Sequence, residues 1–131
     1  DFIVYNAEGK VLLGQRLNRP AQGYWFVPGG RIYKNEAITA AFSRLTLAEL
    51  GQQFVYSQAQ LLGIYDHFYT DSVFGEGIST HYVVAAHQFT VQQLDHLPQV
   101  QHDSYAWFDR EQLLENDLVH PNTKAYFLKG L

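Results

Sequence analysis

One segment in the first half of the chain spaces glycine, glutamate and arginine in a way that suits a metal ion and a phosphate. Glu36 follows Gly30 by six positions, and Arg44 is followed by Glu49 and Gly51. Carboxylate oxygens are ligands that Mg²⁺ and Mn²⁺ prefer, and guanidinium groups match phosphate oxygens. The segment therefore predicts a metal-assisted reaction on a substrate that contains phosphate.

Most of this segment is expected to form a helix of about four turns. Asn35 and Glu36 can cap and charge the helix start, and Gly51 can adopt the left-handed conformation that ends a helix. At about 100° per residue, four positions then fall within an arc of roughly 60°. They are Ile38, Phe42, Leu45 and Glu49. The last position on this otherwise apolar face is therefore an acid.

The carboxylate of Glu49 needs an explanation. It would lie on the apolar face and near the negative end of the helix dipole, and both features disfavour it unless a cation is close. From the residues alone, two interpretations stay open. Glu49 could escape at the rim of the core or pair with an arginine, or it could bind a divalent metal ion. The spaced glycines and arginine around it favour the metal ion.

The composition fits one compact enzyme domain spanning residues 1–131. This length can bury one sizeable core but hardly two, and no linker-like stretch divides it. The absence of cysteine excludes disulfides and thiolate chemistry. No transmembrane stretch or signal peptide is visible, so a cytoplasmic protein without a membrane partner is expected. Because a strand already begins at Asp1, we expect a further segment to precede it.

Charge and aromatic content narrow the class of ligand. The net charge of −4 argues against nonspecific binding to nucleic acid. Four of the nine basic residues nevertheless lie in the first third of the chain, which suits a compact polyanion: Arg16, Arg19, Arg31 and Arg44. The aromatic residues, 15% of the chain, could stack on a base or sugar, but packing in a core or a subunit interface is the simpler interpretation.

Periodicity and turn residues predict an α/β fold in which helices cover two sides of a mixed sheet. Strands are expected at residues 1–6, 11–17, 60–68, 80–91 and 105–108, and further helices at residues 110–115 and 122–128.

The segment that begins at Gly30 resembles the Nudix hydrolase frame G-x5-E-x7-R-E-U-x-E-E-x-G-U, in which U is a bulky apolar residue. Leu45 and Ala48 stand where that family places glutamates, so one metal-binding carboxylate of three remains. This loss, together with the run Asn-Arg-Pro-Ala-Gln-Gly at residues 18–23, is similar to one atypical branch, the GDP-mannose mannosyl hydrolases.

The resemblance implies a Nudix-type α/β/α sandwich around a mixed β-sheet. It also implies hydrolysis of GDP-mannose, and of GDP-glucose, to GDP and free hexose with inversion at the anomeric carbon. Mg²⁺ is the expected cofactor, with Mn²⁺ as an alternative, and a homodimer is the expected assembly. Fewer carboxylates can suffice because attack at carbon needs no metal-activated nucleophile, only stabilisation of the departing diphosphate.

The resemblance assigns the metal site and the general base. The inner metal ligands would be Glu49 and the backbone carbonyl of Gly29, and Gln101 would lend an oxygen to the metal shell. His102 would be the general base, since an imidazole that titrates near neutrality can take a proton from water. From the residues alone, a histidine beside an aspartate in a polar loop is more often simply solvated.

Arginines and a tyrosine are implied for the diphosphate. Arg16 would stabilise the departing group, and Tyr82 would donate a hydrogen bond to it. Arg31 and Arg44 would assist in binding or hold the adjoining loop. A salt bridge between Arg44 and Glu36, which only fixes the loop to the helix, is an equally good interpretation.

The remaining assignments each have a structural alternative. Asp1 and His67 match positions that orient the base or the substrate, with Phe2 beside Asp1 as a substrate contact, yet Asp1 could fray and His67 could be a satisfied core histidine. Tyr105 could contact the nucleotide or simply pack. The other histidines are expected to be structural or solvated: His81, His87, His96 and His120.

Two other functions compete with this hypothesis. A conventional Nudix pyrophosphohydrolase would act on a nucleotide sugar or a dinucleotide, but Leu45 and Ala48 cannot bind its additional metal ions. A noncatalytic nucleotide-sugar sensor would keep the arginines and aromatics, but it could dispense with His102 and Glu49.

Overall fold

A computed structural model describes residues 1–75, 77–95, 97–98 and 102–128, without the side chains of residues 102 and 103. In this part of the chain a six-stranded mixed sheet dominates, with the order β3-β2-β1-β5-β4 and with β6 paired to β2. The strands are β1 (Phe2–Tyr5), β2 (Val11–Arg16), β3 (Trp25–Phe26), β4 (Gln60–Tyr69), β5 (Thr80–Thr90) and β6 (His102–Phe108).

The short strand β1 lies in the middle of the sheet. It runs parallel to β5, with Phe2 opposite His87, and antiparallel to β2, with Tyr5 opposite Val11. The longest pairing joins β4 and β5 as an antiparallel ladder from Gln60 to Tyr69. A parallel neighbour so far along the chain requires a long crossover connection, and α1 belongs to that crossover.

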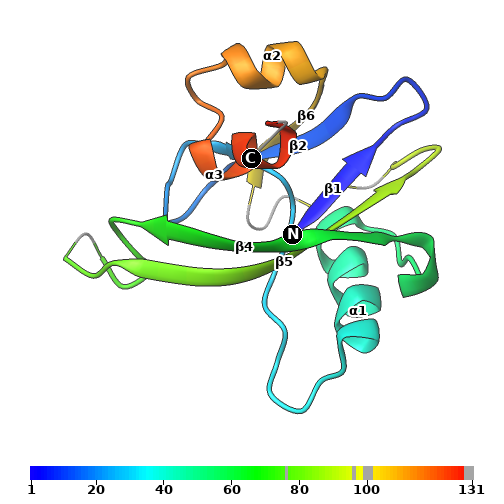
Figure 1. Cartoon of the computed structure of the whole chain (residues 1–131), viewed down its shortest axis with the longest axis horizontal. Helices are drawn as coiled ribbons and strands as arrows, with labels where there is room; N and C mark the ends of the chain where they lie inside the picture. The colour runs from blue at the N-terminus through cyan, green and yellow to red at the C-terminus, as the bar shows by residue number, and fades with distance from the viewer. Residues whose placement is uncertain (76, 96, 99–101, 129–131) are drawn as a thin grey trace.

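Helices cover both sides of the sheet, as Figure 1 shows. Helix α1 (Ile38–Leu50) lies on one side, and α2 (Arg110–Glu115) and α3 (Pro121–Lys124) lie on the other. Two short 3₁₀ turns complete the elements, η1 (Tyr56–Gln58) and η2 (Ala125–Phe127). The predicted α/β class with a mixed sheet between helices is confirmed.

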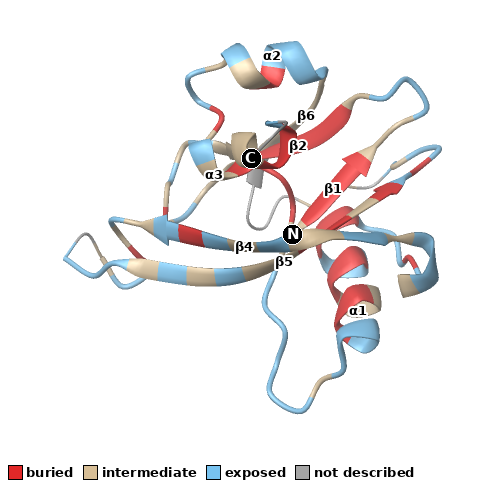
Figure 2. Ribbon diagram, viewed as in Figure 1, coloured by how far each residue is buried: buried red, intermediate tan, exposed pale blue. Residues whose placement is uncertain are grey.

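Two apolar clusters form the core, one on each side of the sheet, and alternation along β1 explains the division. Phe2 and Val4 pack with α1, whereas Ile3 packs with α2 and the terminal turns. All three side chains are at most 3% exposed. Figure 2 shows this continuous burial along β1 and β2 and on the inner side of α1.

Helix α1 has the predicted length and end but not the predicted start. Gly51 ends it at φ 74°, in the left-handed conformation. The N-cap is Ala37, without a side-chain cap, and Asn35 itself has φ 65°. The prediction that Asn35 and Glu36 cap the helix was therefore wrong. The Glu36 carboxylate instead accepts hydrogen bonds from Tyr33 N and Arg44.

Three other elements differ from the sequence prediction, and one of them, β6, begins at His102 and not at Tyr105. Strand β3 was not predicted, since two residues are too few to show periodicity. The C-terminal helix starts earlier than predicted, at Pro121, and tightens into η2 after Lys124. His120 caps it by accepting a hydrogen bond from Asn122 N. Within the described residues no helix combines the length and apolarity needed to cross a bilayer.

The end of α1 gives a stability prediction. Gly51→Ala should lower the free energy of unfolding by about 1 kcal/mol, because a Cβ disfavours the left-handed conformation. Gly51→Asn should cost less, since asparagine tolerates this conformation better. Urea unfolding of both variants and the wild type measures the difference, and an equal cost for the two variants would contradict the explanation.

Candidate active site

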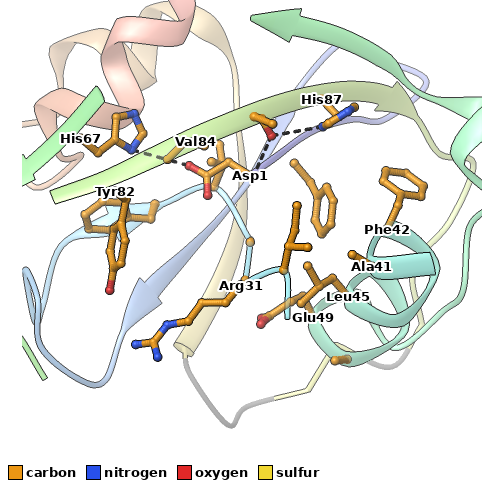
Figure 3. A pocket seen from close by; sticks show the side chains of 18 of the residues that line it. Asp1, Arg31, Ala41, Phe42, Leu45, Glu49, His67, Tyr82, Val84 and His87 are labelled. Atoms are coloured by element: carbon orange, nitrogen blue, oxygen red, sulfur yellow. Dashed lines mark hydrogen bonds and ion pairs between the residues drawn. The ribbon is translucent and has the colours of Figure 1, made fainter. Parts of the chain in front are cut away.

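A cleft of about 790 Å³ opens between α1, the Gly29–Gly30 bend and strands β4 and β5. Most of the predicted site residues line it, namely Asp1, Phe2, Arg16, Gly29, Arg31, Arg44, Glu49, His67 and Tyr82. Figure 3 shows Asp1 between His67 and His87, and Glu49 on α1 beside Leu45. The fold thus gathers residues from Asp1 to His87 around one cavity.

The bend at Gly29 and Gly30 makes close approaches on both sides. A Cβ on Gly29 would lie 2.4 Å from Asp1 Oδ1, and a Cβ on Gly30 would lie 2.4 Å from Leu45 Cδ2 and 3.6 Å from Glu49 Oε1. Phe2 N donates a 2.8 Å hydrogen bond to Pro28 O, which ties β1 to this bend. Glycine is therefore needed for space at both positions.

Glu49 is a buried carboxylate without a compensating contact. It is 6% exposed. Among the described residues no hydrogen bond or ion pair reaches its carboxylate. Burial raises its pKa to about 7, and the positive charge of Arg16 opposes this rise only in part. The arginine pair considered from the sequence is absent among the described residues, and Glu49 instead faces the cleft at the edge of the core.

The cleft residues fit one divalent cation. A buried, uncompensated carboxylate beside a glycine backbone is a suitable inner ligand, and Mg²⁺ often takes one or two carboxylates together with substrate phosphates and water. The described part of the chain contains no cluster of three or more His, Cys, Asp or Glu that could hold a metal ion. Leu45 packs against Gly30 where a second carboxylate would stand. Glu49 would therefore hold a single cation, with the backbone of Gly29 as its proposed second ligand.

Arg44 binds the loop that precedes α1. Its Nε lies 2.7 Å from Glu36 Oε2, and its Nη2 lies 2.9 Å from Glu36 Oε1 and 2.7 Å from Arg31 O. Its guanidinium also lies 4.0 Å from the centre of the Tyr33 ring. The hydrogen bonds from Arg44 lower the pKa of Glu36 to about 2. The salt bridge considered from the sequence is thus present, and it fixes the loop to the helix.

Asp1 is held in place rather than frayed. Its Oδ2 accepts a 2.7 Å hydrogen bond from Tyr126 and lies 4.0 Å from His67 Nδ1. Its backbone carbonyl accepts a hydrogen bond from His87 N. No sequence pattern indicated the Tyr126 contact, because a tyrosine in a terminal helix predicts only packing.

His67 is buried but not satisfied. It is 4% exposed, and its Nε2 has no hydrogen-bond partner among the described residues. Burial lowers its pKa to about 4, so the imidazole is neutral at physiological pH. The alternative of a satisfied core histidine was therefore wrong.

Arg16 and Phe2 differ in how they face the cleft. The Arg16 guanidinium lies 5.7 Å from the centre of the Phe26 ring, and its Nε donates a 3.3 Å hydrogen bond to Asn18 O. Phe2 is 3% exposed and packs edge-on against Phe42. Phe2 thus contributes mainly to the core, and substrate contact by its ring stays a prediction.

Strand β6 carries the remaining predicted residues. Its backbone pairs with β2 so that position 102 lies opposite Arg16, but the His102 side chain and all of Gln101 lie outside the described part of the structure. Tyr105 donates a short hydrogen bond to Pro98 O and packs against the α1-side cluster. Burial, with the nearby charge of Glu49, raises the pKa of Tyr105 to about 12.

The described histidines to which the resemblance gives no role have structural contacts, although His87 also lines the cleft. His87 Nδ1 lies 3.1 Å from Ala85 O and so donates to it, which leaves Nε2 to accept from Tyr56. His81 pairs with Asp66, and His120 caps α3. His96 lies outside the described residues.

Comparisons with known proteins agree with this architecture. A model of the NUDIX domain matches residues 1–129. The low-salt glycan biosynthesis protein Agl8 of Haloferax volcanii is 41% identical over 125 residues, which cover 95% of this chain and 76% of that protein.

Solved structures share the fold at lower identity. The MutT protein of Methanosarcina mazei Go1 has a TM-score of 0.72 at 21% identity, covering 96% of this chain and 86% of that one. A MutT NUDIX hydrolase of Burkholderia pseudomallei has a TM-score of 0.64 at 26% identity, covering 97% and 96%. The NUDIX domain of Shewanella oneidensis NrtR, solved with ADP ribose, has a TM-score of 0.67 at 19% identity, covering 96% and 82%.

The raised pKa of Glu49 gives a pH-dependent prediction for the metal-free protein. Glu49 ionises near 4.5 when unfolded but near 7 when folded, so stability is lost as pH rises between these values. Glu49→Gln cannot ionise. It should therefore unfold like the wild type at pH 4 and be more stable by about 3 kcal/mol at pH 8.

Urea unfolding at the two pH values measures this difference, with the exposed Glu8→Gln as the control that should follow the wild type at both. Millimolar Mg²⁺ should raise the melting temperature of the wild type at pH 8 but not that of Glu49→Gln. Equal stabilisation of both by Mg²⁺ would place the cation elsewhere.

Proposed function

Because the chain belongs to the NUDIX domain family of hydrolases, we propose that it hydrolyses GDP-mannose, and also GDP-glucose, to GDP and free hexose. Water would attack the anomeric carbon of the sugar with inversion, and the bond between that carbon and the diphosphate oxygen would break. Mg²⁺ is the proposed cofactor.

The observation that carries the proposal is the solitary carboxylate on the cleft side of α1. Glu49 is buried there, while Leu45 fills the space beside Gly30 with a methyl group. Hydrolysis at phosphorus commonly relies on several carboxylates and metal ions to activate water beside a negatively charged group. With one buried carboxylate, the cleft is better suited to binding the diphosphate than to activating water for attack on its phosphorus atoms.

The polar groups of the cleft suit attack at carbon. A bound cation would neutralise charge on the diphosphate as it leaves. Arg16 and Arg31 both line the cleft and would share that charge, and Tyr82 would donate a hydrogen bond to it. Diphosphate is a good leaving group, so no acid is needed to protonate it, and one general base suffices.

His102 is the proposed base. The β2–β6 register sets its backbone opposite Arg16, which lines the cleft. A base there would take a proton from water on the side of the sugar away from the diphosphate. Asp1 and His67, which both line the cleft, would orient the sugar or this water.

Two relatives support a nucleotide-sugar substrate. The name of the Haloferax volcanii protein places it in glycan biosynthesis, which consumes activated sugars. The Shewanella oneidensis domain binds ADP ribose, a sugar linked to a nucleoside diphosphate, on the same fold. A diphosphate with a sugar on each side therefore suits the cleft proposed here.

Analysis of the products tests the reaction. GDP-mannose should yield GDP and mannose, because the bond at carbon breaks. In heavy-oxygen water the label should enter the sugar, as mass spectrometry of both products would show. Release of GMP and hexose 1-phosphate would instead identify a conventional pyrophosphohydrolase. Tight binding without Mg²⁺-stimulated turnover would identify a sensor.

A substitution of the proposed base tests the assignment of His102. His102→Gln keeps hydrogen-bonding capacity but cannot accept the proton, so kcat should fall by about 10²–10⁴-fold. His81→Gln is the control, because His81 is half exposed and pairs with Asp66. Steady-state rates of both variants decide the question, and near-normal turnover by His102→Gln would remove the assignment.

A further inference from the structure

The two ends of the described chain meet beside the cleft. Tyr126, in η2, donates a 2.7 Å hydrogen bond to Asp1 Oδ2 across 125 positions of sequence. Asp1 lines the cleft, whereas Tyr126 does not. Tyr126 is 8% exposed and belongs to the apolar cluster under α2. Its hydroxyl therefore reaches Asp1 from the core side.

The position of Tyr126 is itself well determined. Arg110, the first residue of α2, donates two hydrogen bonds to the carbonyl of the next residue, Phe127, from Nε at 3.1 Å and Nη2 at 2.6 Å. The Tyr126 ring packs edge-on against Tyr65, with centroids 4.8 Å apart, and tilts against His67 at 5.5 Å. Backbone and ring are thus both fixed, so the hydroxyl has little freedom of direction.

The hydroxyl is a permanent donor. Burial raises the pKa of Tyr126 well above its ordinary value, so the phenol keeps its proton throughout the physiological range. A carboxylate only accepts, so the donor and acceptor roles in this pair are unambiguous. A hydrogen bond to a charged carboxylate is also stronger than one between neutral groups.

The two oxygens of Asp1 have different surroundings. Oδ2 is bound by Tyr126, and His67 Nδ1 stands 4.0 Å from the same atom, too far for a hydrogen bond. Oδ1 lies over Gly29, where a Cβ would approach it to 2.4 Å. Without the hydroxyl, Oδ2 would be free to turn toward His67, and that rotation would carry Oδ1 away from the bend.

We propose that Tyr126 is a positioning residue for the reaction, because its hydroxyl fixes the Asp1 carboxylate with Oδ1 toward the Gly29 side of the cleft and withholds Oδ2 from His67. This inference rests on the proposed function insofar as Asp1 orients the sugar or the water. Tyr126 would act only through Asp1, so its contribution would belong to turnover and not to binding.

The first test compares two neighbouring tyrosines. Tyr126→Phe removes one oxygen atom and should lower kcat for GDP-mannose by about 10–100-fold, with KM changed by less than about twofold. Tyr65→Phe is the matched control, since that ring packs in the same cluster away from the cleft lining, and its kcat should stay near the wild-type value. Equal kcat losses in the two variants would overturn the proposal.

A double-mutant cycle tests whether Tyr126 acts through Asp1. In an Asp1→Ala background, Tyr126→Phe should cost less than about twofold in kcat, because the group it positions is already gone. A full multiplicative loss would show that Tyr126 acts by another route. Arg110→Met, which releases the Phe127 carbonyl, should reproduce part of the loss and serves if Tyr126→Phe does not fold.

A structural measurement separates this inference from the proposed reaction. In a crystal structure of metal-free Tyr126→Phe, the Asp1 carboxylate should turn so that Oδ2 comes within about 3 Å of His67 Nδ1. An unmoved carboxylate would overturn the positioning role, whatever the products are. Release of GMP and hexose 1-phosphate by the wild type would overturn the proposed function while leaving this result valid.

Discussion

The close approach of the Gly29–Gly30 backbone to its neighbours is the constraint on which the cleft depends. On one side the bend meets Asp1, and on the other it meets Leu45 and the carboxylate of Glu49. A side chain at either glycine would push β1 and α1 apart. Since β1 supplies apolar residues to both clusters of the core, the geometry of the cleft and the stability of the fold are set by the same contacts.

The electrostatics of the cleft depend on which of its charged groups are already paired. Arg44 forms a salt bridge with Glu36 that neutralises its charge locally. It therefore holds the loop before α1 in place more than it attracts a polyanion. Arg16 and Arg31 line the cleft. Burial raises the pKa of Glu49, so its carboxylate ionises less readily unless a cation lies close to it. An apolar residue at position 45 and a small one at position 48 keep the local negative charge low. These features support the proposed reaction, in which the diphosphate departs and water attacks carbon.

Local patterns in the sequence predicted most of the elements, because they depend on neighbours within a few positions. Periodicity and turn residues identified the strands other than β3, and Gly51 identified the end of α1. The failures have long-range causes. Glu36 does not cap α1 since Arg44, eight residues away, binds its carboxylate. The unpartnered nitrogen of His67 and its position near Asp1 depend on contacts between β4, β1 and η2, which no local pattern encodes. The resemblance to a known family pointed to the cleft residues, but only the three-dimensional contacts showed which charges are already paired.

The meeting of Asp1 with Tyr126 has a consequence for biosynthesis. A ribosome makes Asp1 long before Tyr126, and β1 must also wait for β5 before its parallel pairing can form. The carboxylate of Asp1 therefore cannot find its tyrosine partner on a nascent chain until η2 has emerged from the exit tunnel. Premature termination upstream of that turn would yield a polypeptide that has the lining residues from Asp1 to His87 but lacks the hydroxyl that holds the Asp1 carboxylate.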